Sequence, residues 1–538
     1  MRAMESFYER LSALDQTFLA LETPNAYMHV AITAIFEPGN LSTPQGGVDI
    51  DRIRQHIAAR LRFIPRYRQR LEMLPMGGPI WVDDARFDLN FHVRHGSLPR
   101  PGGERQLQRR CAEILERALD RRRPLWEIWI IEGLEDGRFA MLAKVHHCMV
   151  DGIAGIDILA ALLGTEPTDA LEAIEPWAPR PQPAERVLFR DEVRRRARAS
   201  VNAVFGLTDA LRAPRETSRA VGGHASAMYR LMRELGSAPA TPFNQPIGPH
   251  RRVDWLATDF ADIKAIRNSL GGTMNDVVLT TVAGAVGSLL SRRRAPLDGE
   301  FRTVVPVSVR TADERGVPGN RVSLWLANLP VHERNARRRL EAVREVTARL
   351  KAEQEERSAE IVTQAADWTT SNVINLAARL INSARRFNMI VTNVPGPPVP
   401  FYLLSAKMVA GYPHLPLFEN QGLGVALLSY AGTLYWGIAG DWNQMPDLGE
   451  FIGALRDAFD ELRAEAAALA PQASSGPPPS SDGRRQFTVH RGANAAATSS
   501  AAAAGARGRG ARTRATSAAG GLRHAAPTPR LGTIRSSR

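Results

Sequence analysis

The sequence predicts an α/β protein of two domains, joined by a helical linker and followed by a disordered tail. Three observations support this. The chain has 538 residues, which is too many for one ordinary core. Hydrophobic residues make up 44% and charged residues 23%, as in globular proteins. Segments with helical and strand periodicity alternate in two regions, and a proline-rich segment separates those regions.

The first domain is predicted over residues 1–165. Apolar residues at Ile50, Ile53, Ile57 and Leu61 have the spacing of one helix face. An Asp-Gly pair between two apolar runs indicates a hairpin within 124–147. The expected elements are helices at 11–22, 48–71, 104–120 and about 152–163, and strands at 26–39 and on both sides of the hairpin turn.

A linker is predicted over residues 166–245. Its first part is proline-rich. A helix is then expected at 186–212, with Phe189 and Val193 on its apolar face and arginines elsewhere. Such a helix fits two roles: contact with a membrane surface, or a crossover packed on the protein body.

The second domain is predicted over 246–470. The run 277–290 is apolar but contains Thr, Gly and Ser and is too short to span a membrane, so we expect a buried helix there. The other expected elements are a strand at 301–310, a helix at 333–357, strands around 388–397, 422–430 and 433–441, and a helix at 446–469. Residues 471–538 are rich in Arg, Ala, Gly and Ser and are expected to be disordered.

The net charge of +13 is concentrated in the tail. Residues 471–538 contain 11 arginines, no lysine and one acidic residue, which account for ten of the thirteen positive charges. Phe487 is the only aromatic residue there, so bases would have little to stack on and nucleic acid is not an expected partner. With no signal peptide or transmembrane segment in view and only two cysteines, a cytoplasmic location is predicted.

The segment HHCMVDG, residues 146–152, carries the clearest chemistry. Two adjacent histidines end an apolar strand, and neighbouring strand residues point to opposite faces, so one of them can face a cleft. Adjacent histidines do not have the i,i+4 spacing typical of zinc ligands on a helix, and no GxSxG nucleophile motif is present. A histidine that acts directly as general base fits the pattern, with two structural histidines as the alternative.

The sequence resembles the bacterial wax ester synthase/diacylglycerol acyltransferase family, within the HHxxxDG superfamily of CoA-dependent acyltransferases. The resemblance extends from about residue 10 to 465 and rests on several motifs in the family's order. They are LSALDQTFLALE (11–22), PLWE (124–127), HHCMVDG (146–152), NDVVL (275–279), VPVSVR (305–310) and NVPGP (393–397). It implies two chloramphenicol-acetyltransferase-like domains with an active-site tunnel between them.

The resemblance also implies roles for single residues. His147 would be the general base and His146 the packed, supporting member of the pair. Asp151 would fix its loop by pairing with an arginine, for which Arg310 is our hypothesis, and Gly152 would permit the turn. The alternative for Cys148, a nucleophile, is rejected because it occupies a variable position of the motif.

Further candidates lie in the other motifs. Asn275 is a candidate oxyanion donor or positioning residue, or else a helix cap. Asp276 would hold its loop, or lie at the helix start as a favourable charge. Candidate substrate-binding residues are Asp276, Trp126, Asn393, Pro395 and Gly396; for Trp126 a place in the core, and for NVPGP a simple turn, are the alternatives.

The function that follows is transfer of a long-chain acyl group from acyl-CoA to diacylglycerol or to a long-chain alcohol, without an acyl-enzyme. The partners would be these substrates and the surface of a membrane or lipid droplet, and no metal or redox cofactor is expected. Two alternatives stay open: an enzyme that takes its acyl group from a carrier protein, as condensation domains do, and a non-catalytic protein of lipid surfaces.

Overall fold

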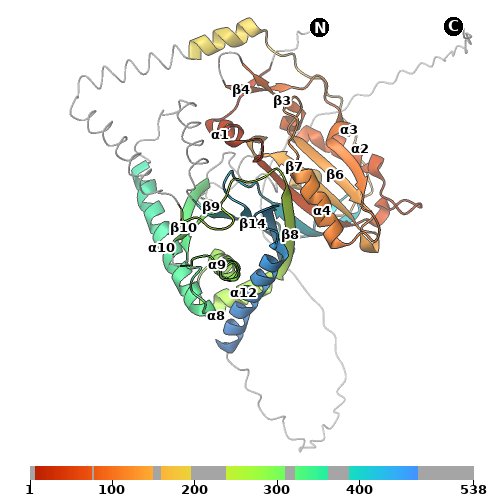
Figure 1. The fold of residues 1–538 in the computed structure, drawn as a ribbon. Coiled ribbons are helices and arrows are strands. Elements are labelled where there is room, and N and C mark those ends of the chain that lie inside the picture. Colours follow the sequence, from red (N-terminus) through yellow and green to blue (C-terminus); the bar gives the residue numbers. More distant parts are fainter. Residues whose placement is uncertain are drawn as a thin grey trace, which may run out of the picture. The chain divides into compact units, whose positions relative to one another are not determined.

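The computed structural model describes residues 7–74, 78–149, 159–195, 238–297, 299–308, 322–361 and 387–469 (Figure 1). Its first six-stranded sheet has the order β12-β13-β2-β7-β6-β5. All neighbours in it are antiparallel except β5 and β6. The strands are β2 (His29–Glu37), β5 (Val93–Ser97), β6 (Trp126–Glu132), β7 (Phe139–His146), β12 (Tyr402–Leu403) and β13 (Ala406–His414).

The second six-stranded sheet has the order β10-β9-β11-β14-β15-β8, with β11 parallel to both of its neighbours. Its strands are β8 (Arg251–Asp259), β9 (Phe301–Ser308), β10 (Val322–Leu329), β11 (Met389–Pro395), β14 (Leu423–Tyr430) and β15 (Thr433–Asp441). A small third sheet contains β1 (Glu9–Arg10), β4 (Pro79–Asp83) and β3 (Gln69–Met73).

Four helices pack together beside the second sheet: α8 (Phe260–Leu270), α9 (Met274–Arg292), α10 (Ala336–Ile361) and α12 (Leu448–Leu469). Figure 1 shows α9 end-on with the other three around it. Within the described part of the chain, α9 is the one helix long and apolar enough to cross a membrane, but 72% of its apolar window is buried inside the protein. The buried helix predicted at 277–290 is therefore confirmed.

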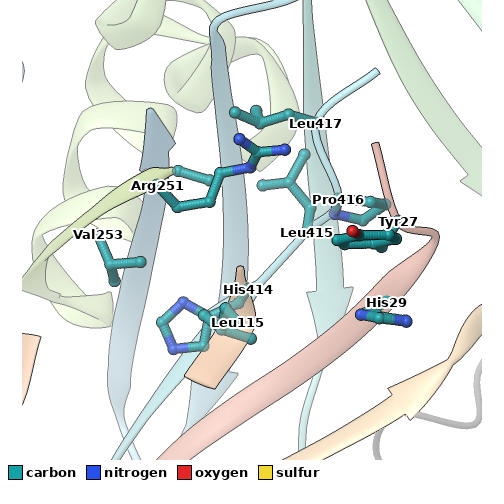
Figure 2. A pocket seen from close by; sticks show the side chains of 10 residues that line it. Tyr27, His29, Leu115, Arg251, Val253, His414, Leu415, Pro416 and Leu417 are labelled. Carbon is teal, nitrogen blue, oxygen red and sulfur yellow. The ribbon is translucent and has the colours of Figure 1, made fainter. Parts of the chain in front are cut away.

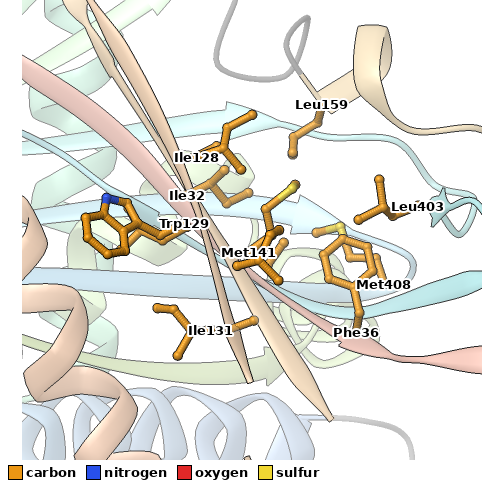
Figure 3. Close-up of a cluster of buried hydrophobic side chains, with 14 of the residues drawn as sticks. Ile32, Phe36, Ile128, Trp129, Ile131, Met141, Leu159, Leu403 and Met408 are labelled. Carbon is orange, nitrogen blue, oxygen red and sulfur yellow. The ribbon is translucent and has the colours of Figure 1, made fainter. Parts of the chain in front are cut away.

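The first sheet is completed by strands from distant sequence. β13 pairs with β2, so that His414 lies opposite Ala31. The first hydrophobic core accordingly mixes Ile32 and Met141 with Leu403 and Met408 (Figure 3). The two sheets approach each other closely here, because a Cβ added to Gly437 of β15 would lie 1.7 Å from the carbonyl oxygen of Pro413.

The α/β class is confirmed, whereas two predicted helices are too long. The helix predicted at 48–71 ends at Arg60 as α2 (Ile50–Arg60). Ile64 has φ −130° and ψ 67°, a non-helical conformation that the following Pro65 favours. The helix predicted at 104–120 ends at Leu115 as α4 (Glu104–Leu115). The predicted boundaries near residues 165, 245 and 470 stay predictions.

The expected linker helix is described only over 185–195, and the rest of 186–212 lies outside the described residues. Leu188 is 3% exposed and packs with Ile80 and Val82, whereas Phe189 is 55% and Val193 43% exposed. The side of the helix that faces the protein body is thus not the predicted apolar face. The predicted tail, residues 471–538, also lies outside the description.

Candidate active site

The two histidines stand at the end of β7, which is buried along its whole length at the centre of the first sheet. His146 lies opposite His29 in the ladder with β2. The backbone N–H of His146 donates to the carbonyl of Leu125 at 3.0 Å, and that of His147 donates to the carbonyl of Met28 at 2.8 Å. Both neighbouring segments therefore hold the backbone at this point.

His146 is the buried member of the pair, at 1% exposure. Its Nδ1 accepts the backbone N–H of Cys148 at 3.1 Å. A neutral ring whose Nδ1 accepts a hydrogen bond carries its proton on Nε2. That nitrogen lies 3.0 Å from Oε1 of Glu22, although not aligned for a hydrogen bond, so the contact is mainly electrostatic.

His147 begins the short helix η5 (His147–Met149) and is half-buried. The ring of Phe18 stacks on its imidazole, with centroids 3.8 Å apart and planes at 21°. Burial lowers the pKa of His147 to about 4, because the charged imidazolium loses hydration. The backbone of His147 itself raises the pKa, but by less than burial lowers it. Its Nδ1 is buried without a hydrogen-bond partner among the described residues. The ring is therefore neutral near pH 7.

Phe18 belongs to α1 (Ala13–Leu21), the helix formed by the predicted segment 11–22. Ser12 caps its start by accepting the backbone N–H of Asp15 at 3.1 Å. Glu22 is its C-cap residue, shortly before Pro24, which cannot continue a helix. Sequence reasoning assigned no role to Phe18 or Glu22. Their four-residue spacing within a family motif was the available signal.

Asn275 and Asp276 open α9. Thr273 is the N-cap, so the alternative that Asn275 caps the helix is wrong. Asp276 completes a capping box by accepting the backbone N–H of Thr273 at 2.7 Å, and it also accepts the hydroxyl of Thr347 in α10 at 2.7 Å. Asn275 instead accepts a 2.8 Å hydrogen bond from the side-chain nitrogen of Asn393.

The NVPGP segment ends β11, whose last residue is Pro395. Its Gly396 donates its N–H to the hydroxyl of Ser429 at 3.2 Å. A Cβ at Gly396 would lie 2.2 Å from the carbonyl oxygen of Ser429, so only glycine fits this close approach. Pro395 is exposed. Asn393 itself lies within β11, opposite Leu427 of β14.

Trp126 lies in the core, at 1% exposure. Its indole N–H donates to the carbonyl of Tyr67 at 2.8 Å, and its ring stacks on His92 with centroids 4.5 Å apart. The neighbouring Leu125 supplies the carbonyl that holds His146. The PLWE motif thus supports the histidine pair through its backbone.

Two cavities lie near the end of β7, both lined in part by Tyr27 and His29. The one in Figure 2 contains Tyr27, His29, Arg251 and His414. The other shares Tyr27 and His29 with it, and its lining also includes His146. His147 lines neither of them. The remaining residues of the second cavity are Glu22, Thr23, Pro24, Ala118, Leu119, Arg121 and Leu125.

The structure joins the candidate residues into two groups: the histidine pair with α1, and Asn275 with Asn393. Asp151, Gly152 and Arg310 lie outside the described residues. Within the described ranges, no group of three or more His, Cys, Asp or Glu side chains is arranged to hold a metal ion. Cys148 is buried, and burial raises the pKa of its thiol well above the usual value, which disfavours a reactive thiolate.

Comparison with known proteins is consistent with these motifs. The family model described as "Wax ester synthase/diacylglycerol acyltransferase catalytic domain" matches residues 11–278, and the one described as "WS/DGAT C-terminal domain" matches 318–463. A probable diacylglycerol O-acyltransferase of Mycobacterium tuberculosis, tgs1, is 34% identical over 460 residues, which cover 84% of this chain and 95% of that protein.

A solved structure of the same family is also similar to this chain. The wax ester synthase/diacylglycerol acyltransferase from Marinobacter aquaeolei VT8 is similar with a TM-score of 0.60 and 26% identity, covering 85% of this chain and 99% of that chain. Polyketide synthase associated protein 5 from Mycobacterium tuberculosis, at 17% identity and a TM-score of 0.50, shares the fold over 85% of this chain and 98% of its own. The predicted two-domain fold is confirmed by the likeness to the Marinobacter protein.

Proposed function

The chain belongs to the wax ester synthase/diacylglycerol acyltransferase family and is an acyltransferase, and we propose that it transfers a long-chain acyl group from acyl-CoA to the hydroxyl of diacylglycerol or of a long-chain alcohol. The observation that carries this proposal is His147, a neutral imidazole at the end of β7. Its backbone N–H donates to the carbonyl of Met28, and its ring stacks on Phe18.

His147 acts as the general base. Because Nδ1 is buried, Nε2 is the nitrogen that takes the proton from the acceptor hydroxyl. The proton leaves while the hydroxyl oxygen attacks the thioester carbon. The C–S bond then breaks, and the proton passes to the departing CoA thiolate, so that ester and free CoA result. A base with a pKa of about 4 does not ionise an alcohol beforehand. The proton therefore moves as the carbon–oxygen bond forms.

Asn275 donates to the oxygen that becomes negative in the tetrahedral intermediate. Its side-chain oxygen is occupied by Asn393, which fixes the amide so that its nitrogen is left for another acceptor. A donor fixed in advance stabilises developing charge without reorganising. Asp276 maintains the helix start from which Asn275 projects. Following the family motif, we propose that Asp151 pairs with Arg310 and that Gly152 permits the turn after His147.

The protein meets its apolar substrates at the surface of a membrane or lipid droplet. In the helix at 185–195, Arg186, Phe189, Arg190 and Val193 are exposed at helical spacing and form one face. Apolar side chains between arginines suit an anionic lipid surface. Glu192 keeps the opposite side on the protein body through an ion pair with Arg10 at 2.9 Å.

The experiment that tests this function measures thiol release from palmitoyl-CoA by the full-length protein, with dioleoylglycerol, hexadecanol or no acceptor. The proposal expects release that depends on an acceptor, together with formation of the matching ester. The better acceptor identifies the physiological substrate class. Absence of release with both acceptors would overturn the proposal, and turnover that requires a carrier-bound acyl group would favour the condensation-type alternative.

A further inference from the structure

Helix α1 contacts the histidine pair at two points. Phe18 and Glu22 are four residues apart, so they lie on the same side of the helix. Phe18 stacks on His147, with centroids 3.8 Å apart. The carboxylate of Glu22, in the C-cap position, lies 3.0 Å from Nε2 of His146. Each of the two side chains thus meets one of the two histidines.

Glu22 is also bound to the segment that holds His147. Its Oε1 accepts the backbone N–H of Met28 at 2.9 Å, and the carbonyl of Met28 accepts the backbone N–H of His147 at 2.8 Å. Two hydrogen bonds therefore connect this carboxylate to the backbone of the proposed base. Its other oxygen, Oε2, pairs with Arg121 at 2.5 Å.

The electrostatics favour an ionised Glu22. Burial raises the pKa of its carboxyl, but His146, Arg121 and the N–H of Met28 together outweigh burial and lower it. An ionised carboxylate 3.0 Å from Nε2 attracts the positive end of the His146 ring, whose Nδ1 accepts the N–H of Cys148. The side chain of Glu22 is 10% exposed, so water screens these contacts little.

We infer that Phe18 and Glu22 are positioning residues, which fix the ring and the backbone of His147 for proton transfer. Phe18 sets the plane of the imidazole, and Glu22 sets the backbone through Met28 and His146. The inference rests on the proposed function, because it assigns these residues to the work of the general base. It gives the LSALDQTFLALE motif a physical role that sequence reasoning had not assigned.

The test compares Glu22→Gln and Phe18→Leu with the wild type. Gln keeps the size of Glu22 and an acceptor for Met28, but loses the charge toward His146 and Arg121. We expect kcat to fall about 10- to 100-fold, because small displacements of a catalytic group are costly, while the KM for palmitoyl-CoA stays within about twofold. Hydrogen–deuterium exchange should become faster at the amides of residues 146–148 and stay unchanged in β14.

Two control variants match the substitutions. Glu172→Gln removes a more exposed carboxylate that pairs with arginines, Arg60 and Arg62. Phe63→Leu changes a phenylalanine that is 55% exposed. Both should keep the kcat of the wild type. Unchanged kcat in folded Glu22→Gln and Phe18→Leu, or a rise in KM with kcat preserved, would overturn the inference.

The exchange measurement separates this inference from the proposed function. If the wild type shows no acceptor-dependent turnover, the proposed function fails, but the protection of the His147 amide still reports on Glu22. Lost protection in Glu22→Gln then supports the positioning contact, and unchanged protection overturns it. If Glu22→Gln does not fold, Phe18→Leu still tests the ring-stacking contact through kcat, since it leaves the ionic contacts of α1 in place.

Discussion

Asn393 donates a 2.8 Å hydrogen bond from its side chain to the side-chain oxygen of Asn275. The bond joins the end of β11 to the first turn of α9, two segments that are 118 positions apart in the sequence. Each of the NVPGP and NDVVL motifs supplies one partner of this bond. The tight approach of Gly396 to Ser429 fixes the bend that follows Asn393.

Asn275→Ala should lower kcat about 100-fold, the usual effect of removing one oxyanion donor. Asn393→Ala should lower it less, because the donor remains and only its orientation is freed. Steady-state kinetics with palmitoyl-CoA check both. Asn268→Ala, which changes an exposed asparagine of α8, is the control and should have no effect. Wild-type kcat in Asn275→Ala would exclude an oxyanion role.

The acid side of the pH–rate profile should fall near pH 4 rather than near 6.5. The pKa of His147 in the folded protein is about 4, because burial disfavours its charged form, so the base stays neutral through mildly acidic pH. Initial rates measured between pH 8 and 5 should therefore change little. An inflection close to pH 6.5 would contradict the buried environment of this ring.

Folding stability should decrease as the pH falls from about 6.5 to 4. The pKa values of His92 and His414 are also lowered by burial, to about 4 and about 3. Between pH 6.5 and 4 the unfolded chain binds protons that the folded protein does not, so acid favours unfolding. Circular dichroism recorded beside the rates distinguishes loss of the fold from protonation of His147.

Asp276→Ala should destabilise the protein by about 1–3 kcal/mol. It removes the acceptor for the backbone of Thr273 and leaves the buried hydroxyl of Thr347 without its 2.7 Å partner. Thermal unfolding measures the effect. Glu341→Ala, which breaks an exposed pair with Arg337 on α10, should change the midpoint far less. Equal midpoints for the two variants would show that the cap contributes little.

Binding to lipid should depend on the exposed face of the helix at 185–195. Phe189→Ser with Val193→Ser should reduce co-sedimentation with vesicles that contain anionic lipid and dioleoylglycerol, since two exposed apolar side chains are lost. Leu324→Ser removes a side chain that is 68% exposed elsewhere and serves as the control. Equal sedimentation of all three proteins would place the lipid contact on another part of the chain.

Local patterns in the sequence were sufficient to predict most of the elements. Helical spacing predicted α1 and α12, and the hairpin of β6 and β7 followed from its Asp-Gly turn. The pairing of β13 with β2 could not be predicted, because its partners lie more than 350 residues apart and no local pattern encodes a register across that distance.

The candidate site was predictable in part. His147 could be selected because a histidine after a buried strand, followed by Asp-Gly, fits a familiar motif. The roles of Phe18 and Glu22 depend on how α1 docks against η5, and Asn275 finds Asn393 only when β11 and α9 are folded. Contacts between distant elements decide these roles, and single residues do not reveal them.

The proposed reaction depends on His147 removing the proton from the acceptor hydroxyl. The most direct measurement compares acceptor-dependent CoA release by the wild type, His147→Ala and the control His332→Ala, which replaces an exposed histidine. His147→Ala should lose about 10²- to 10⁴-fold in kcat, whereas His332→Ala should keep wild-type activity. Equal turnover by His147→Ala and the wild type would contradict this role.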